Sequence, residues 1–138
     1  MRDLPRQLTV DELAALFSGR TRFVERLAEL DDPLRRAREV ARSLSAEEKT
    51  EALAAHPRIG EPSPEQHGDD PAVLAELAEL NREYEERFGF RFVVFVNGRS
   101  RAEILPVLRE RVRGTREQEM DTALEELCAI AEARWRTS

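Results

Sequence analysis

The chain has 138 residues, of which 41% are hydrophobic and 36% are charged, and its formal net charge is −6 at pH 7. Such a chain can bury a core of its own, so we expect one ordered domain of 138 residues and not a disordered chain. The single cysteine excludes an internal disulfide framework. The negative charge disfavours a nucleic-acid partner, and no apolar run approaches the length of a membrane span. No signal-like segment opens the sequence, so a cytoplasmic location is expected.

Three helices are predicted in the first 45 residues. The pattern Thr9-Val-Asp-Glu12 is a capping box and opens the first of them. The second begins near Thr21, followed by apolar residues at helical spacing. Asp32-Pro33 supplies an N-cap and a proline at the first position of the third helix.

A fourth helix leads into the central loop of the chain. Ser45-Ala-Glu-Glu48 is another capping box, and its helix is expected to run to about Ala55. Pro57 stops it there, because proline disfavours helical geometry in the residue that precedes it. His56 is therefore expected at the point where the backbone turns extended.

Beyond the central loop, a helix and a β-prone run are predicted. Asp70-Pro71 starts the helix, and Gly89 marks its end. Residues 90–96 are rich in phenylalanine and valine and are closed by Asn97-Gly98, which makes them the one strand candidate. A lone strand has no ladder partner, so this segment is either a buried extended segment or pairs across a subunit interface.

The C-terminal part reads as two further helices. Ser100-Arg-Ala-Glu103 is a third capping box, with Gly114 as the expected C-cap of its helix. Thr115-Arg-Glu-Gln118 opens the last and longest helix, which carries a long apolar stripe. The predicted fold is an all-α, single-domain helical bundle with one short extended segment near residues 90–96.

The central loop concentrates the polar chemistry of the chain. Two histidines and one cysteine are too few for the usual metal sites, and no glycine-rich phosphate loop is present, so neither a metal nor a cofactor is expected. Cys128 lies among apolar residues of a helix and reads as a buried, inert thiol. His56 alone could equally cap a helix or be solvated, so the residues by themselves support only a helical domain with a candidate acid–base pocket. The loop offers His56, Arg58, Glu61, Glu65, Gln66 and His67.

Several short motifs, in order and spread from about residue 10 to residue 136, make the sequence recognisable. Together they resemble the signature of the 2-oxo-4-hydroxy-4-carboxy-5-ureidoimidazoline (OHCU) decarboxylases, a family of urate degradation. The motifs are His56-Pro-Arg-Ile-Gly60, Ser63-Pro-Glu-Gln66, Asn81-Arg-Glu-Tyr84, Phe88-Gly-Phe-Arg-Phe-Val93, Gly98-Arg-Ser100 and Ile130-Ala-Glu-Ala-Arg134-Trp135.

The resemblance implies an all-helical, cofactor-independent and usually homodimeric enzyme that converts the small molecule OHCU into (S)-allantoin and CO2. By that likeness His56 and Glu65 occupy the catalytic positions, and which of them acts on the substrate hydroxyl stays open. Arg134 is expected to reach an anionic or carbonyl group of the substrate. The substrate-binding positions implied are Pro57, Ser63, Gln66, Phe90, Phe92, Val94 and Arg134.

The central loop departs from the family pattern. Only four residues separate Gly60 from Glu65, where the family usually has a longer connection, and Pro62 and Pro64 fix the backbone on both sides of Ser63. Either the loop is a trimmed, stiff version of the same site or Glu65 no longer points into the pocket. A related enzyme for another ureido or imidazolone acid, and a non-catalytic binding module, are therefore the alternative functions.

Overall fold

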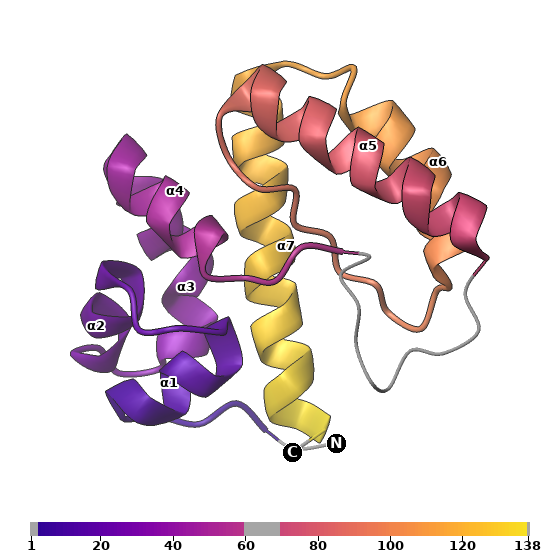
Figure 1. Cartoon of the computed structure of the whole chain (residues 1–138). Coiled ribbons are helices and arrows are strands. Elements are labelled where there is room, and N and C mark those ends of the chain that lie inside the picture. The colour runs from indigo at the N-terminus through magenta and orange to yellow at the C-terminus, as the bar shows by residue number, and fades with distance from the viewer. Residues whose placement is uncertain (1–2, 60–69, 138) are drawn as a thin grey trace.

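The computed structural model describes residues 3–59 and 70–137, and within these ranges the chain forms seven helices and no strand (Figure 1). The all-α prediction is thus confirmed. The helices are α1 (Val10–Phe17), α2 (Arg22–Ala28), α3 (Pro33–Ser43), α4 (Ala46–Ala54), α5 (Pro71–Phe88), α6 (Arg101–Arg111) and α7 (Arg116–Thr137).

The helix starts follow the predicted caps closely. All three capping boxes are formed: the side chains of Thr9, Ser45 and Ser100 each accept an N–H at 3.1 Å, and the glutamate three residues later accepts the cap N–H at 3.0 Å. These reciprocal bonds satisfy N–H groups that a helix start otherwise leaves unpaired. The C-terminal end of α5 is also as predicted, since Gly89 has a left-handed backbone with φ 79°.

One predicted cap, Asp32, is in place but lacks its side-chain bond, and another, Gly114, is wrong. Asp32 precedes α3 but makes no side-chain cap, because its backbone is left-handed (φ 52°, ψ 51°) and its N–H donates to the carbonyl of Arg6 at 2.7 Å. The C-cap of α6 is Val112 and not Gly114. The chain leaves α6 through right-handed turns, in which the Gly114 N–H donates to the Arg111 carbonyl at 3.1 Å, so no left-handed glycine is needed.

Helix α7 is the central element of the fold. Figure 1 shows it between the cluster formed by α1–α4 and the pair formed by α5 and α6. It packs against α1, α3 and α4. Ion pairs from Arg38 to Glu125 and Glu132 reinforce the contact with α3. Its apolar stripe is buried as predicted at Met120, Ala123, Leu124, Leu127 and Ala131, whereas Ile130 and Trp135 are partly exposed.

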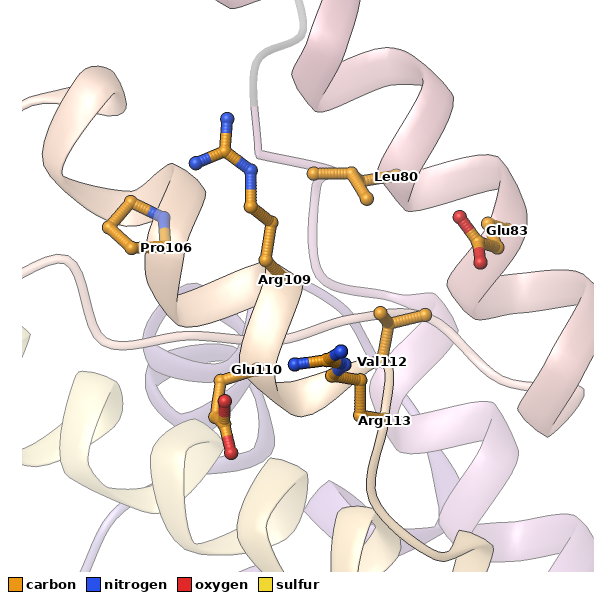
Figure 2. A pocket seen from close by; sticks show the side chains of 7 residues that line it. All are labelled: Leu80, Glu83, Pro106, Arg109, Glu110, Val112 and Arg113. Carbon is orange, nitrogen blue, oxygen red and sulfur yellow. The ribbon is translucent and has the colours of Figure 1, made fainter.

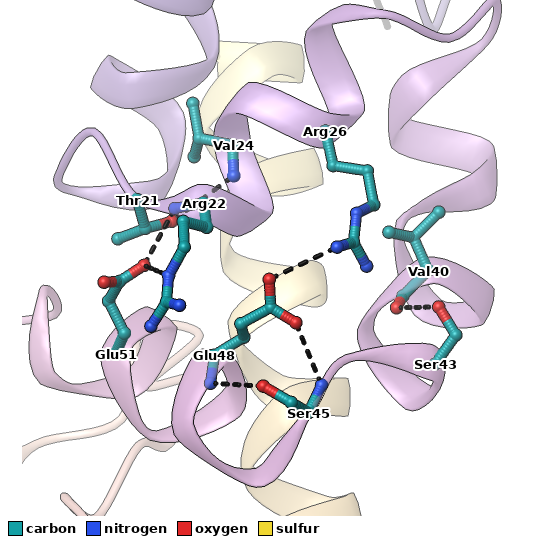
Figure 3. Close-up of polar contacts among 9 residues, drawn as sticks. All are labelled: Thr21, Arg22, Val24, Arg26, Val40, Ser43, Ser45, Glu48 and Glu51. Carbon is teal, nitrogen blue, oxygen red and sulfur yellow. Dashed lines mark hydrogen bonds and ion pairs between the residues drawn. The ribbon is translucent and has the colours of Figure 1, made fainter.

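Helix α4, which leads to His56, is fixed to α2 through Glu48 and Glu51. Glu48 closes the capping box of α4 and also pairs with Arg26 at 3.2 Å, and Glu51 accepts the backbone N–H of Arg22 at 2.8 Å (Figure 3). The carboxylate of Glu51 thereby caps the start of α2 from another helix. These contacts hold α4 against α2 before the chain reaches the central loop.

The segment between α5 and α6 crosses the core without regular structure. Phe90, Phe92, Val93 and Val94 are buried. Arginine side chains provide donors for carbonyl groups along the segment. Arg111 donates to the Val93 carbonyl at 2.7 Å, and Arg99 donates to the carbonyls of Phe95 and Val96. The expected buried, non-helical segment is confirmed, and guanidinium groups replace the missing ladder partner. Pairing of this segment across a subunit interface stays a prediction.

None of the helices in the described part of the chain is long and apolar enough to span a membrane.

Candidate active site

His56 lies immediately beyond the end of α4. The helix stops at Ala54, and the His56 N–H still donates to the carbonyl of Leu53 at 3.1 Å. Pro57 follows, with its ring exposed, and ends the helical path as predicted. The imidazole is partly buried, and its Nδ1 atom is buried without a hydrogen-bond partner among the described residues. A buried polar atom of this kind is costly unless a ligand or a water molecule completes it.

A cavity of about 420 Å³ opens beside this histidine. Its volume falls within the range of roughly 300–1,000 Å³ that is usual for small-molecule sites. The walls combine apolar side chains from the 90–96 segment and α7 with a few polar groups. The lining residues are His56, Val94, Phe95, Val96, Asn97, Ile130, Ala133, Arg134 and Thr137.

Arg134 brings a fixed guanidinium group to the same cavity. Its Nη1 atom donates to the carbonyl of Leu16 at 2.8 Å and to Oγ of Ser18 at 2.7 Å, both at the end of α1. Among the described residues no partner is found for its Nε or Nη2 atoms, so two nitrogen atoms remain for a ligand. Burial lowers the pKa of Arg134 from its ordinary value. A half-buried cation held in this way suits an anionic or strongly polarised oxygen.

The surroundings of His56 favour the neutral imidazole. Burial is the largest cause, and the positive charges of Arg134 and Arg91 add to it, so that the pKa of His56 is lowered from 6.5 to about 4. Each of these effects disfavours the charged ring. At neutral pH the site therefore presents a neutral imidazole, which can accept a proton, next to a permanent cation.

Close packing of the end of α1 shapes the same region. A Cβ atom built on Gly19 would lie 2.9 Å from the Cβ of Ala55, the residue before His56. Such an approach is tolerated only because Gly19 has no side chain. Ser18, which accepts from Arg134, directly precedes this glycine, so one short turn supports both Arg134 and the end of α4.

The structure brings together three of the predicted site residues: His56, Val94 and Arg134 all line the cavity. Pro57 is exposed beside His56 and does not line it. Ser63, Glu65 and Gln66 lie outside the described residues, so their expected contacts stay predictions.

The expected position of Phe90 and Phe92 on the pocket wall is not what the structure shows. Both side chains are at most 3% exposed and pack edge-on against Tyr84, with ring centroids 5.8 and 5.2 Å from it. Phe88 joins the same cluster at 4.7 Å from Tyr84. Strict alternation would place Phe90, Phe92, Val94 and Val96 on one face. The segment is not a regular strand, and the consecutive residues Val94, Phe95 and Val96 all line the cavity while the two rings pack against Tyr84 of α5.

Other lining residues were not singled out from the sequence. Ile130 and Ala133 precede Arg134 by four positions and one position on α7, and Thr137 follows it by three. The four-residue spacing places Ile130 on the same helix face as Arg134, a signal that was available in the sequence. Asn97 is different, because its position at the cavity depends on the path of an irregular segment.

A second cavity, of about 500 Å³, lies between α5 and α6 (Figure 2). It is larger, but charged groups of both signs line it and Arg109 already pairs with Glu76. Its side chains offer no histidine or thiol for proton transfer, and no group of metal-binding residues occurs in the described part of the chain. The lining residues are Leu80, Glu83, Pro106, Arg109, Glu110, Val112 and Arg113.

The cavity beside α4 thus has the features of an acid–base site for a small polar substrate, set in an all-helical domain. Comparisons with known proteins agree with this class. A family model described as OHCU decarboxylase matches residues 2–136. The chain therefore belongs to the OHCU decarboxylase family.

Individual relatives support the assignment. The chain is 34% identical over 118 residues to the 2-oxo-4-hydroxy-4-carboxy-5-ureidoimidazoline decarboxylase of Haloferax volcanii. The alignment covers 77% of this chain and 68% of the relative. The chain is 36% identical over 101 residues to the uric acid degradation bifunctional protein TTL of Arabidopsis thaliana, covering 61% of this chain. The alignment spans only 31% of that bifunctional protein, and 30% of the corresponding Bacillus subtilis protein PucL.

Solved structures show the same fold. A crystal structure of OHCU decarboxylase in the presence of (S)-allantoin superposes with a TM-score of 0.76 at 28% identity, covering 89% of this chain and 94% of that one. A structure of (S)-allantoin synthase gives a TM-score of 0.73 at 24% identity, covering 93% of this chain and 48% of that one.

Proposed function

We propose that this chain catalyses the decarboxylation of OHCU to (S)-allantoin and CO2 in urate degradation. The observation that carries the proposal is the cavity that places a neutral His56 beside the fixed guanidinium group of Arg134. Membership of the family supports it, as do relatives named for this reaction and a structural neighbour crystallised in the presence of (S)-allantoin.

The substrate supplies its own electron sink. When CO2 leaves, the electron pair of the broken C–C bond moves into the adjacent C=N unit, so that no cofactor is required to accept it. A proton must leave the neighbouring hydroxyl, and a proton must be added to carbon from one face to give the (S) product. Neutral His56 can accept the hydroxyl proton, because its Nδ1 atom is unpartnered and its pKa lies below neutrality.

We assign Arg134 to the 2-oxo group of the substrate and not to its carboxylate. A guanidinium group that held the departing carboxylate would stabilise the ground state most, because the product CO2 is neutral. The 2-oxo group is conjugated with the C=N unit and gains negative charge as CO2 leaves. Donors already fixed at that oxygen lower the barrier.

Glu65 is the second catalytic group in this proposal, with Pro57, Ser63 and Gln66 as substrate contacts. These roles rest on the family motifs alone. Action as a homodimer in the cytoplasm is part of the same proposal.

The test follows circular dichroism while urate oxidase and hydroxyisourate hydrolase generate the unstable substrate. Added protein should accelerate the appearance of optically active allantoin, and His56→Ala and Glu65→Ala should each remove most of this acceleration while remaining folded. His67→Ala, which removes the other histidine, is the matched control and should keep the wild-type rate. A wild-type rate no faster than the uncatalysed one would refute the proposal.

A further inference from the structure

We propose that Arg91 is a positioning residue for His56: it caps the end of α4 and fixes the main chain that carries the imidazole. The inference rests on the proposed function, because it concerns how the proton acceptor of that reaction is held.

Helix α4 has no C-terminal cap of its own. Its last turn contains no basic residue, and its C-cap, Ala55, keeps a right-handed backbone with φ −71° and ψ −24°. Helices commonly end in a left-handed glycine or in a cation that binds the last carbonyl groups. Pro57 has no N–H to donate to these carbonyls. The end of α4 therefore needs a donor from elsewhere, at the place where His56 must be held.

Arg91 supplies this donor from the segment between α5 and α6. Its Nη1 atom donates to the carbonyl of Ala54 at 2.8 Å and to the carbonyl of His56 at 2.6 Å. One nitrogen thus bridges two carbonyls two residues apart, on either side of Ala55. The side chain of Arg91 is only 19% exposed, so water competes weakly for these bonds.

Helix α5 completes the support. Glu85 lies 3.9 Å from Nε of Arg91 and also binds Arg58 through two bonds of 2.9 and 3.0 Å. Asn81 donates to the carbonyl of Ile59 at 2.9 Å. Four of the six residues from 54 to 59 are therefore tied to α5 or to Arg91, while the His56 side chain lines the cavity. A proton acceptor must be held within a fraction of an ångström of its productive position, which this arrangement accomplishes.

The same guanidinium group acts on His56 electrostatically. The charged groups around the ring in the described part of the chain are Arg134 from α7 and Arg91 from the connecting segment, with the Arg58–Glu85 pair behind Arg91. Arg91 thus both positions the main chain and disfavours the imidazolium form. A purely structural arginine would do only the first.

The test compares Arg91→Gln and Arg91→Lys with Arg116→Gln. Arg116 is a matched control because it also donates to a backbone carbonyl at the end of a helix, that of Phe88 at the end of α5, at 3.0 Å. We expect Arg91→Gln to lower kcat on the order of 10- to 100-fold with KM changed less than about 2-fold. In ¹H–¹⁵N NMR titrations its His56 pKa should rise but stay below 6.5, because burial and Arg134 still lower it. Arg91→Lys keeps the charge and one donor nitrogen but loses the planar fork of the guanidinium group. It should therefore recover part of kcat and leave the His56 titration near that of the wild type.

The outcomes separate this inference from the proposed function. A wild-type chain without activity refutes the function, and the His56 titration then decides the inference alone. An unchanged titration in Arg91→Gln overturns the inference, as does an Arg116→Gln variant that loses as much kcat. Should Arg91→Gln fail to fold, Arg91→Lys still decides. The lysine keeps the positive charge, so a His56 pKa that nevertheless rises would contradict the electrostatic part of the inference.

Discussion

The phenolic hydroxyl of Tyr84 donates a 2.8 Å hydrogen bond to Oε1 of Glu119, a carboxylate that is only 5% exposed. The same oxygen accepts from Nε of Arg111 at 2.8 Å, and Arg111 donates onward to the carbonyl of Val93. Burial, and then the bond to Glu119, raise the pKa of Tyr84 well above its ordinary value. This chain of contacts joins α5, α7 and α6 to the residue before Val94, which lines the cavity.

Glu119→Gln should destabilise the fold strongly, since it leaves Arg111 buried without its counter-charge. We expect a loss of about 3–5 kcal/mol in the free energy of unfolding. Tyr84→Phe removes only a hydrogen bond to a charged acceptor and should cost about 1.5–3 kcal/mol. Urea unfolding at pH 7 measures both. Glu125→Gln, in a more exposed ion pair, is the control and should cost under about 1 kcal/mol; equal losses at positions 119 and 125 would contradict the prediction.

His56 should make the fold less stable as the pH is lowered. Its pKa is about 4 in the folded chain and 6.5 when unperturbed, so between these values the unfolded chain binds more protons. The contribution to stability is full above about pH 7 and is lost as the pH falls toward 4, by at most about 3 kcal/mol.

Chemical denaturation from pH 7 to pH 4.5 checks this dependence. His56→Asn, which has no titrating ring, should give a shallower slope than the wild type, while the carboxylates contribute equally to both. Parallel slopes would show that the ring is not protected from protonation in the folded chain.

Arg134→Gln should reduce activity without unfolding the chain. The variant loses the charge at the cavity, and removal of one such donor typically costs on the order of 100-fold in kcat. The His56 pKa should rise, because one of its two neighbouring cations is gone. The allantoin assay and NMR titration measure the two effects. Arg136→Gln, two positions further on α7 and outside the cavity lining, should leave both at wild-type values.

Cys128 should be unreactive in the folded protein. Burial raises the pKa of its thiol to about 12, and the side chain is 1% exposed. A thiol-reactive disulfide reagent should therefore modify the native chain very slowly and the urea-unfolded chain at once. Cys128→Ala should retain activity; an inactive but folded variant would instead point to thiol chemistry at this position.

Local rules account for most of the fold. Capping boxes at Thr9, Ser45 and Ser100 were predictable because the bonds that form them span only three residues. Asp32 stands at the N-cap of α3 as predicted, but the loss of its side-chain bond was not predictable. Its backbone follows a contact with Arg6, 26 positions earlier in the chain, and no local pattern encodes that contact.

The candidate site shows the same difference between residues that local motifs indicate and residues that depend on distant contacts. His56 and Arg134 were found through short motifs, and the structure brings them to one cavity from elements 78 positions apart. Arg91 was overlooked, although a charged residue within the β-prone run 90–96 is unusual. Its partners are carbonyl oxygens, which every residue possesses, so nothing in the sequence indicates which of them it would bind.

All but one of the 22 basic residues are arginines, Lys49 being the exception. Guanidinium groups hold the backbone at Phe88, Val93 and Phe95, as well as at the end of α4. Because a guanidinium group stays protonated throughout the stable pH range and offers five donors in a rigid plane, such supports do not switch off with pH. Replacement of these arginines by lysine would keep the net charge and yet weaken the support of the segment that forms one wall of the cavity. Arginine-to-lysine exchange is therefore a non-conservative change in this molecule.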